Sequence, residues 1–403
     1  MPDIEKYSGV EMADIEKISG HDVPAGGGVT AETPLTGAGT MLAFNGSLGF
    51  NSDVDYTFNL RAWSNHTFTT LCASANFFTV WGIKSDGTLW YCATQNDYVN
   101  GAISNSDLDG EWHQYESADD WEDLTSGENC YGAIKGGEYW FIGSGSMRQR
   151  GDGSTSSVND WTMMNNSKTW VQVAMGEDHT VLRDSNGEVW TCGYNRDYCT
   201  GQGTQSGYLA TLTREQNDLT GATWIAAGNY DSTCVISGQV YFTGQNSGPH
   251  AGFQSSSSSD RNGFTAVNSS ITDVVSTHHQ SRYTMAAITT NGSIRWAGYG
   301  SGNGRPDNNT GSLTSSTNQL SILTGAGTGW TKLFGCASDP SGNRYGGIGF
   351  KSGTAYCGGS NFLNPVKALQ QNSSSSGAWG SITNSGTPAA ASVGENIMVI
   401  SWS

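Results

Sequence analysis

The chain has few charged residues, few prolines and very few positive charges. Only 14% of its 403 residues are Asp, Glu, Lys or Arg, and only 8 are Pro, whereas roughly 25% charged residues are usual in globular proteins. A mostly helical protein would be rich in Ala, Leu, Glu and Lys, so the composition disfavours one. No run of Lys or Arg interrupts a net charge of −17. A surface for duplex DNA or an anionic membrane is therefore not expected, because such binding depends on cations that neutralise phosphates.

Long apolar runs and closely spaced cysteines are also absent. No apolar span of about 18 residues occurs, and the first residues contain no stretch of the kind that directs export. We therefore expect a protein that is made in a cytosol and stays soluble. The cysteines form no C-x-x-C pair, so we expect buried free thiols and no zinc site. The eight are Cys72, Cys92, Cys130, Cys192, Cys199, Cys234, Cys336 and Cys357.

Glycine and aromatic residues are plentiful instead, with 55 Gly, 14 Trp, 16 Tyr and 13 Phe. Disordered chains lack aromatic residues, whereas these are numerous enough for a large core. A hairpin signature recurs six times, about 50 to 60 residues apart, which is typical of a repeat architecture. Each copy has a turn dipeptide ending in Gly, an apolar residue two positions later, usually an aromatic third residue, and a small sixth residue. The turn glycines are Gly87, Gly137, Gly187, Gly238, Gly292 and Gly353.

A second marker, usually Trp, opens a β-prone run upstream of each hairpin and occurs once more near the C-terminus. Four short strands with their turns occupy about 45 to 50 residues, which matches the period. A four-stranded sheet cannot cover its own apolar faces, so successive sheets stack around an axis. The sequence therefore predicts an all-β fold, a seven-bladed β-propeller over residues 37–403. The seven markers are Phe68, Trp121, Trp170, Trp224, Ile271, Trp330 and Trp379.

The seventh repeat is incomplete in this pattern. After Trp379 only one more apolar run follows, from Ile397 to Trp402, whereas the segment from Gly39 to Gly46 has the character of a hairpin strand. We expect this N-terminal strand to complete the last blade, because closing the ring removes both sheet edges.

The Trp-led strand, the run from Gly176 to Asn195 and the repeat period resemble the regulator of chromosome condensation repeat, a seven-bladed propeller family. The resemblance covers residues 37–403 and is sharpest in the third repeat. It implies the propeller fold, but it implies function poorly, because one fold hosts many activities.

Residues 1–36 are predicted to form an extended N-terminal arm with a Gly- and Pro-containing linker. The unit DIEKYSGVEMA at residues 3–13 is followed in register by DIEKISGHDVP at 14–24. Gly9 and Gly20 interrupt any continuous helix, so the unit is typical of a docking arm. The alternative is a tail that packs on its own propeller. The apolar docking residues are Ile4, Tyr7, Ile15 and Ile18.

Such duplicated segments resemble the N-terminal segments of structural proteins in tailed bacteriophages. The resemblance implies a virion protein whose residues 1–30 hold other virion proteins. It also implies that the propeller is displayed outward, where it binds a host-surface glycan or protein, or covers the particle.

No catalytic motif can be identified. Neither G-x-S-x-G nor G-x-x-x-x-G-K-[ST] occurs. We expect His179 to pack within a strand, and adjacent His278 and His279 to lie on opposite strand faces, which disfavours a shared metal site. We therefore assign no catalytic residue, no cofactor and no resident metal.

The densest negative charge lies between the first and second repeats and includes Asp107, Asp109 and Glu111. It is interpreted as a solvated loop, with a calcium site or a patch that docks Lys or Arg as the alternative. The spacing lacks the pattern of a calcium-binding loop. Aromatic residues in loops beside Asn, Gln and Ser suit a carbohydrate or protein surface, although ordinary loop anchoring also explains each one. These are Tyr98, Trp112, Tyr115, Tyr208, Phe253 and Tyr299.

Three classes of function follow from these features. The first is a non-enzymatic virion protein that is structural or adhesive. The second is a regulatory binding propeller, such as an exchange factor for a small GTPase or an enzyme inhibitor. The third is a polysaccharide-degrading enzyme on a virion, for which a carboxylate pair such as Asp107 and Glu111 would be needed.

Overall fold

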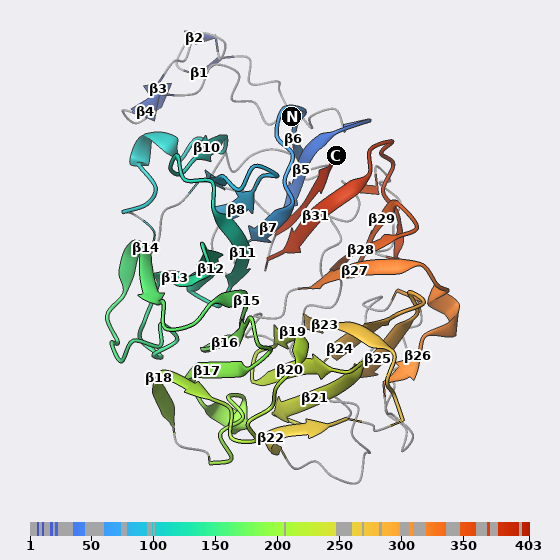
Figure 1. Cartoon of the computed structure of the whole chain (residues 1–403). Helices are drawn as coiled ribbons and strands as arrows, with labels where there is room; N and C mark the ends of the chain where they lie inside the picture. Colours follow the sequence, from blue (N-terminus) through green and yellow to red (C-terminus); the bar gives the residue numbers. More distant parts are fainter. Residues whose placement is uncertain are drawn as a thin grey trace.

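Seven four-stranded antiparallel sheets form a ring in the computed structural model, and each sheet is one blade of a β-propeller (Figure 1). The all-β, seven-bladed prediction is confirmed. Within the described ranges, no helix has the length and apolar character needed to cross a lipid bilayer. The structure describes residues 6–7, 10–11, 17–18, 21–22, 35–44, 60–73, 79–94, 99, 101–204, 207–246, 260–267, 270–281, 284–298, 306–308, 320–335, 347–359, 369–370, 378–394 and 397–403.

The strands of the first four blades follow chain order from the innermost to the outermost. Blade one contains β7 (Thr70–Ala73), β8 (Thr79–Ile83), β9 (Leu89–Ala93) and β10 (Trp112–Gln114). Blade two contains β11 (Trp121–Ser126), β12 (Cys130–Lys135), β13 (Glu138–Gly143) and β14 (Val158–Asn165). Blade three contains β15 (Trp170–Met175), β16 (His179–Asp184), β17 (Val189–Tyr194) and β18 (Tyr208–Arg214). Blade four contains β19 (Ala222–Ala227), β20 (Asp231–Ile236), β21 (Gln239–Gly244) and β22 (Arg261–Ala266).

The last three blades repeat this order until the chain ends. Blade five contains β23 (Val274–Ser281), β24 (Thr284–Thr289), β25 (Ile294–Gly298) and β26 (Ser321–Ile322). Blade six contains β27 (Trp330–Gly335), β28 (Gly347–Lys351), β29 (Thr354–Gly358) and β30 (Gly380–Ser381). Blade seven combines β31 (Pro388–Val393) and β32 (Ile397–Trp402) with two N-terminal strands, β5 (Gly39–Phe44) and β6 (Leu60–Trp63).

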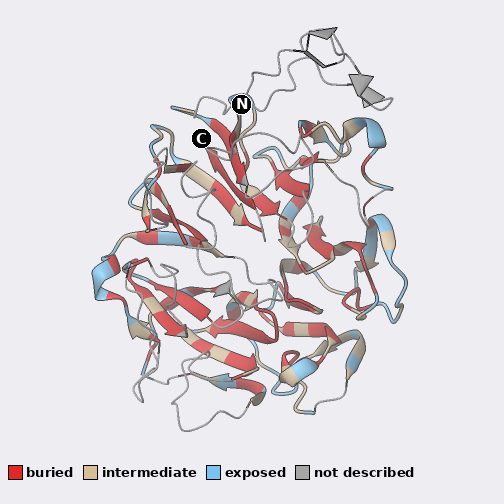
Figure 2. Cartoon of the chain, turned by 180° about the vertical axis from the view of Figure 1, so that it is seen from behind, coloured by how far each residue is buried: buried red, intermediate tan, exposed pale blue. Residues whose placement is uncertain are grey.

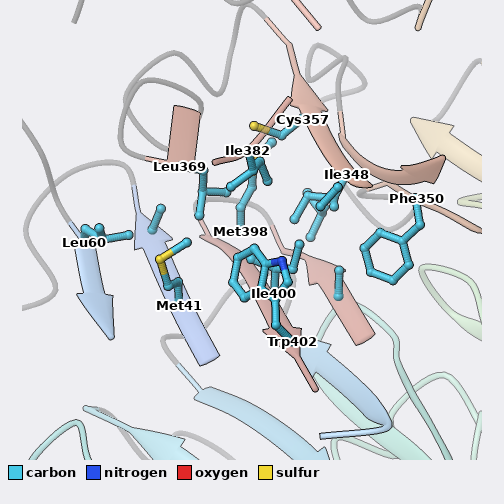
Figure 3. Packing of buried hydrophobic residues seen from close by; sticks show 14 residues of the cluster. Met41, Leu60, Ile348, Phe350, Cys357, Leu369, Ile382, Met398, Ile400 and Trp402 are labelled. Atoms are coloured by element: carbon cyan, nitrogen blue, oxygen red, sulfur yellow. The ribbon is translucent and has the colours of Figure 1, made fainter. Parts of the chain in front are cut away.

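The ring is closed by both ends of the chain. β32 pairs with β5 along six residues, and β5 pairs with β6, so the N-terminus supplies two strands where the sequence predicted one. Figure 3 shows Met41 and Leu60 of the N-terminal strands in the same cluster as Met398, Ile400 and Trp402 of the last strand. All five side chains are buried. The closing blade is therefore held by apolar packing as well as by strand pairing.

The turn glycines of the hairpin signature link neighbouring blades. Each lies between the second and third strands of its blade, as predicted, and each has a positive φ between 73° and 81°. The carbonyl of Gly137 accepts the N–H of Trp170 at 2.8 Å, and the carbonyl of Gly238 accepts the N–H of Val274 at 2.9 Å. Gly87, Gly187 and Gly292 make equivalent bonds. The sequence motif therefore marks a contact between blades as well as a turn.

Most markers of the first strand also have a structural role. In six blades the pairing of the first strand with the second shifts by one residue near its start, where the chain forms a β-bulge. Trp121, Trp170 and Trp330 stand at this position, but in blade four Ala222 occupies it and Trp224 lies two residues later.

One marker was wrongly assigned. Trp379 does not open the seventh blade, which begins at Pro388. It precedes β30, the outer strand of blade six, and its ring packs edge-on against Trp330 at 6.1 Å. The prediction failed because a buried Trp marks a packed position but not the order of the strands.

The predicted arm contains two short hairpins. In the first, β1 (Lys6–Tyr7) pairs with β2 (Val10–Glu11), and in the second, β3 (Lys17–Ile18) pairs with β4 (His21–Asp22). Tyr7 pairs with Val10, and Ile18 pairs with His21, so the two copies of the unit share one register.

The core is divided into clusters that fill the spaces between sheets. Buried residues follow the strands, while exposed residues gather in loops and along outer strands (Figure 2). Seven cysteines are free and buried, as predicted, and Cys336 lies outside the described residues. The blades are thus held together without disulfides in the part of the chain that is described.

Candidate functional site

The first strands of all seven blades surround a central channel. This cavity has a volume of 540 Å³, and its wall includes residues of β7, β11, β15, β19, β23, β27 and β31. It is lined mostly by small polar and apolar side chains, and Asp123 is the only carboxylate among the described lining residues.

Side chains beside the channel join four of the blades to the next one. In these four blades, the side chain two residues after the start of the β-bulge forms a hydrogen bond with the backbone of the following blade. Gln172 is the most complete case, because it donates to the carbonyl of Ile225 at 3.1 Å and accepts its N–H at 3.0 Å. These bonds satisfy backbone groups that lie on the inner edge of the sheets. The four pairs are Asp123 with Val173, Gln172 with Ile225, Trp224 with Thr277 and Lys332 with Ala389.

A buried His–Ser contact lies between blades three and four. His179 Nε2 is 2.9 Å from Ser232 Oγ, and the Ser232 hydroxyl donates to the carbonyl of Cys199 at 2.7 Å. The Ser232 proton is therefore committed, so His179 Nε2 is the donor to Ser232 and cannot act as its base. Burial lowers the pKa of His179 to about 4. His179 is thus a packed strand residue, as expected, and the pair has the properties of a structural contact.

A second buried network reaches the surface next to this contact. Glu177 accepts hydrogen bonds from the Tyr230 hydroxyl at 2.7 Å and from Asn229 Nδ2 at 2.8 Å. Arg196 Nη1 donates to the Tyr230 oxygen at 3.0 Å, and its guanidinium lies 4.3 Å from the centre of the Tyr230 ring. The network holds the exposed Arg196 in a defined position over blades three and four.

Arg148, Tyr194 and Tyr208 form a surface cluster, and Arg196 lies two residues after Tyr194 in the chain; we call these four residues the tyrosine–arginine patch. The Tyr194 and Tyr208 rings stack with their centres 4.9 Å apart, and the Arg148 guanidinium lies 5.8 Å from the Tyr208 ring centre. Tyr208 is 46% exposed and the Arg196 side chain 47% exposed. The patch offers flat rings and cationic groups on a rigid base.

The backbone under this patch is strained. Arg148, Asp197 and Tyr198 have φ values of 65°, 54° and 67°, a region that residues other than glycine rarely adopt. Such conformations cost about 1 to 3 kcal/mol each and gather at functional sites. Three such residues occur in two adjacent loops, so the surrounding structure must hold the backbone of this surface in its strained conformation.

Asp178, between Glu177 and the patch, provides a test of local electrostatics. Burial raises its pKa from 3.8 to about 7, with help from the carboxylates of Glu177 and Glu128. Because the folded state keeps a proton that the unfolded state releases, this group's contribution to the free energy of unfolding falls as pH rises from about 4 to about 7.

In urea titrations across this range, the free energy of unfolding of wild type relative to Asp178→Asn should therefore decrease as pH rises. Asp86→Asn, in an exposed turn, should give no such trend, and parallel curves for wild type and Asp178→Asn would contradict the assignment.

The predicted acidic residues do not converge on one point. They lie between β9 and β10, within blade one, where Asp107 accepts the Tyr91 hydroxyl at 2.7 Å. Asp109 faces His113 Nε2 at 2.9 Å and also accepts the N–H of Glu111 at 2.8 Å. Among the described residues, no group of three or more His, Cys, Asp or Glu side chains is placed to hold a metal ion.

Glu111 has two structural partners on the closing blade. It accepts hydrogen bonds from Arg61 at 2.5 Å and from Trp63 Nε1 at 2.6 Å, both on β6 of the closing blade. An arginine does dock on the acidic loop, but it comes from the same chain, and the pair connects blades seven and one.

The predicted surface aromatics have different positions. Tyr208 is exposed, whereas Trp112 is buried, and its assignment to a binding face was wrong. Trp112 lies on β10 with its ring 4.2 Å from Phe68 and 5.9 Å from Trp63, so it fills the space between blades seven and one. Tyr115 is half-buried and donates to Asp160 at 2.7 Å. Tyr98, Phe253 and Tyr299, and the arm residues Ile4 and Ile15, lie outside the described residues.

The sequence reasoning missed three members of the patch, Arg148, Tyr194 and Arg196. Tyr194 directly follows Gly193, the small residue that ends the third hairpin signature, and Arg196 comes two residues later in the loop after β17. Their position at the end of a repeated strand is the signal that could have identified them.

Comparison with known proteins supports the fold. Residues 170–203 match the family model of the regulator of chromosome condensation (RCC1) repeat, and this range includes the first three strands of blade three and part of the patch. No curated protein gives a significant sequence match. Among solved structures, Prp20p from Saccharomyces cerevisiae is similar, with a TM-score of 0.67 and 13% identity over 92% of both chains. Human WBSCR16 has a TM-score of 0.67 and 15% identity over 91% of this chain and 98% of its own. At such identities the likeness shows a shared seven-bladed propeller fold.

Proposed function

We propose that this protein is a non-enzymatic binding propeller that holds a protein partner at the tyrosine–arginine patch. The patch itself is the observation that carries the proposal. Tyr and Arg are the residue types that most often dominate the energy of protein interfaces. Here the two tyrosine rings stack on each other, Arg196 is held by its hydrogen bond to Tyr230, and Tyr208 and Arg196 are partly exposed.

The arrangement suits recognition because little order is lost on binding. Tyr194 and Tyr208 are already stacked, and the bond from Arg196 to Tyr230 already fixes the guanidinium. A partner that contacts these groups therefore avoids part of the entropy cost of immobilising side chains. The two guanidinium groups of the patch favour a partner that presents carboxylates at the contact surface.

The similar structures support a regulatory version of this role. The structure of Prp20p was described together with binding to Gsp1p and histones, and another yeast RCC1 (Prp20) structure, with a TM-score of 0.68 and 13% identity, contains bound Kap60. By analogy, we propose that this propeller binds a regulated protein, with an exchange factor or an inhibitor as the specific form.

A tethering role for residues 1–30 is a second proposal. It is favoured by the paired hairpins, which present the same 11-residue unit twice in one register. Two copies of a weak binding unit on one chain raise the overall affinity for a repeated target. The virion location remains a prediction, since none of the similarities above supports it.

The proposal predicts that Tyr208→Ala combined with Arg196→Ala weakens partner binding by about 2 kcal/mol or more, or roughly 30-fold, without changing the melting temperature. Immobilised wild type, the double variant, Ile322→Ala and a chain lacking residues 1–30 would be compared by quantitative mass spectrometry of captured proteins. Ile322, 48% exposed on blade five, controls for loss of an exposed side chain.

A protein retained by wild type and Ile322→Ala but lost from the double variant is the expected partner of the patch. Nucleotide release from a captured GTPase would then identify an exchange factor. A protein that only the truncated chain fails to capture binds the arm. If the double variant and wild type capture the same proteins, the proposal that the patch binds a partner is overturned.

A further inference from the structure

Lys332 differs from the other lysines of the protein. Of the five lysines with described side chains, four have Nζ within 3.5 to 5.4 Å of an aromatic ring centre. Such contacts stabilise the cation in place. The four are Lys84 over Trp90, Lys135 over Trp140, Lys168 over Trp190 and Lys351 over Trp330.

Lys332 lies instead in the wall of the central channel. Its Nζ donates to the carbonyl of Ala389 at 3.1 Å, and among the described residues it makes no ion pair. An ammonium group has three donors, so the bond to Ala389 leaves capacity for a further acceptor. Lys332 is an exposed residue of β27, so its ammonium group can be reached by a ligand, while partial desolvation by the surrounding wall lowers its pKa.

Asp123, the single carboxylate among the described lining residues, already accepts a hydrogen bond. Asp123 accepts the N–H of Val173 at 3.0 Å, and the nearby positive charge of Arg183 opposes the effect of burial on its pKa. Arg183 Nε also donates to Gln172 at 3.2 Å, which places the guanidinium beside the channel wall. Apart from the histidines, Asp123 and Lys332 are the charged side chains among the described lining residues, and no ion pair joins them.

The wall on the side of Lys332 is aromatic. Trp224 and His278 line the channel with their ring centres 5.7 Å apart, and Phe334 lines it from the same strand as Lys332. Burial, His279 and the Lys332 ammonium together lower the pKa of His278, so His278 and Lys332 share one region of the cavity. The volume of 540 Å³ is within the range of about 300 to 1,000 Å³ found for small-molecule sites.

We propose that the central channel binds a small organic anion with an aromatic ring, whose carboxylate or phosphate contacts Lys332 Nζ and whose ring packs against Trp224. The anion supplies the acceptor and the negative charge that this part of the channel lacks. The site is separate from the tyrosine–arginine patch, so it adds to the proposed function and does not depend on it.

Isothermal titration calorimetry on the full chain tests the site with benzoate, acetate and benzylamine at constant ionic strength. We expect benzoate to bind in the millimolar range, acetate to bind more weakly because it has no ring, and benzylamine to give no heat because its charge is reversed. Lys332→Met should weaken benzoate binding about ten-fold, as expected for a charge-assisted contact. Lys351→Met removes a lysine that contacts Trp330 and Ala326, and should change the affinity by less than about two-fold.

A thermal melt gives a second readout that does not depend on the variant folding well. Saturating benzoate should raise the melting temperature of wild type, because a ligand that binds only the folded state stabilises it. Absence of heat and of a thermal shift with benzoate would overturn the proposal, as would equal binding of benzylamine or unchanged binding by Lys332→Met. A glutamate-containing peptide serves as a further probe. If this peptide bound and benzoate did not, the proposal would also be overturned, because the acceptor for Lys332 would then come from a partner protein.

Discussion

A chain lacking residues 1–44 is expected to lose the cooperative unfolding of the propeller, or to melt on the order of 10 °C or more below wild type. The deletion removes β5, the strand that joins β32 to β6. It therefore opens the ring at the closing blade and leaves both remaining strands without a partner on that side.

The size of this effect follows from burial. Met41 and Leu42 on β5 are at most 4% exposed, and Leu60 on β6 is 2% exposed. Each buried side chain of this kind contributes about 1.5 to 3 kcal/mol, so their combined loss approaches the whole stability of a typical domain, about 5 to 15 kcal/mol. The exposed edge of β32 would also be free to pair with other molecules, so size-exclusion chromatography should show aggregates.

A chain lacking residues 1–34 is the matched control. It removes the hairpins of the arm but keeps Leu35 and Thr36, whose carbonyls accept bonds from Asn384 and Ser385. Calorimetry should give this chain the melting temperature of wild type. If the two truncated chains had equal melting temperatures, the propeller would be stable as an open ring, and closure by β5 would not contribute to its stability.

The fold could be predicted because every repeat needs the same turn conformation, and the sequence meets this need with the same residue type each time. Each hairpin needs a positive φ at its turn, and Gly137 and Gly187 satisfy it with their neighbours at a regular interval. Local chemistry of this kind is visible in sequence. The assignment of Trp379 failed because burial of a large ring arises wherever two sheets meet, and the sequence alone does not say at which strand.

The candidate site was less accessible to sequence reasoning. Of the six loop aromatics, Tyr208 is exposed, and its importance depends on stacking with Tyr194 and on the position of Arg148. Arg148 lies about one blade earlier in the chain, so its contact with Tyr208 depends on how blades two and three pack. Trp112 shows the converse, since a loop-like sequence environment concealed a strand buried between two blades.

Gly238→Ala is expected to destabilise the protein by about 3 kcal/mol or more, because two costs combine at this turn. The residue has a φ of 77°, so any side chain adds left-handed backbone strain. A Cβ would also overlap the carbonyl oxygen of Thr272 in the segment that leads into blade five. Relief of that overlap would pull the turn away from Val274, whose N–H bonds to the Gly238 carbonyl at 2.9 Å. Urea unfolding followed by tryptophan fluorescence measures the change.

Gly353→Ala separates the two costs, because the same hairpin position in blade six has the same φ of 77° but no atom of the described residues within 4 Å of the added Cβ. The next blade begins at Pro388, which has no N–H to offer, so this turn makes no equivalent bond to it. Only the backbone strain remains, and we expect a loss of about 1 kcal/mol. Equal losses for the two variants would show that the turn glycines act through backbone conformation alone. A much larger loss for Gly238→Ala would show that they also seat each blade against the next, which is the contact that turns separate sheets into a ring.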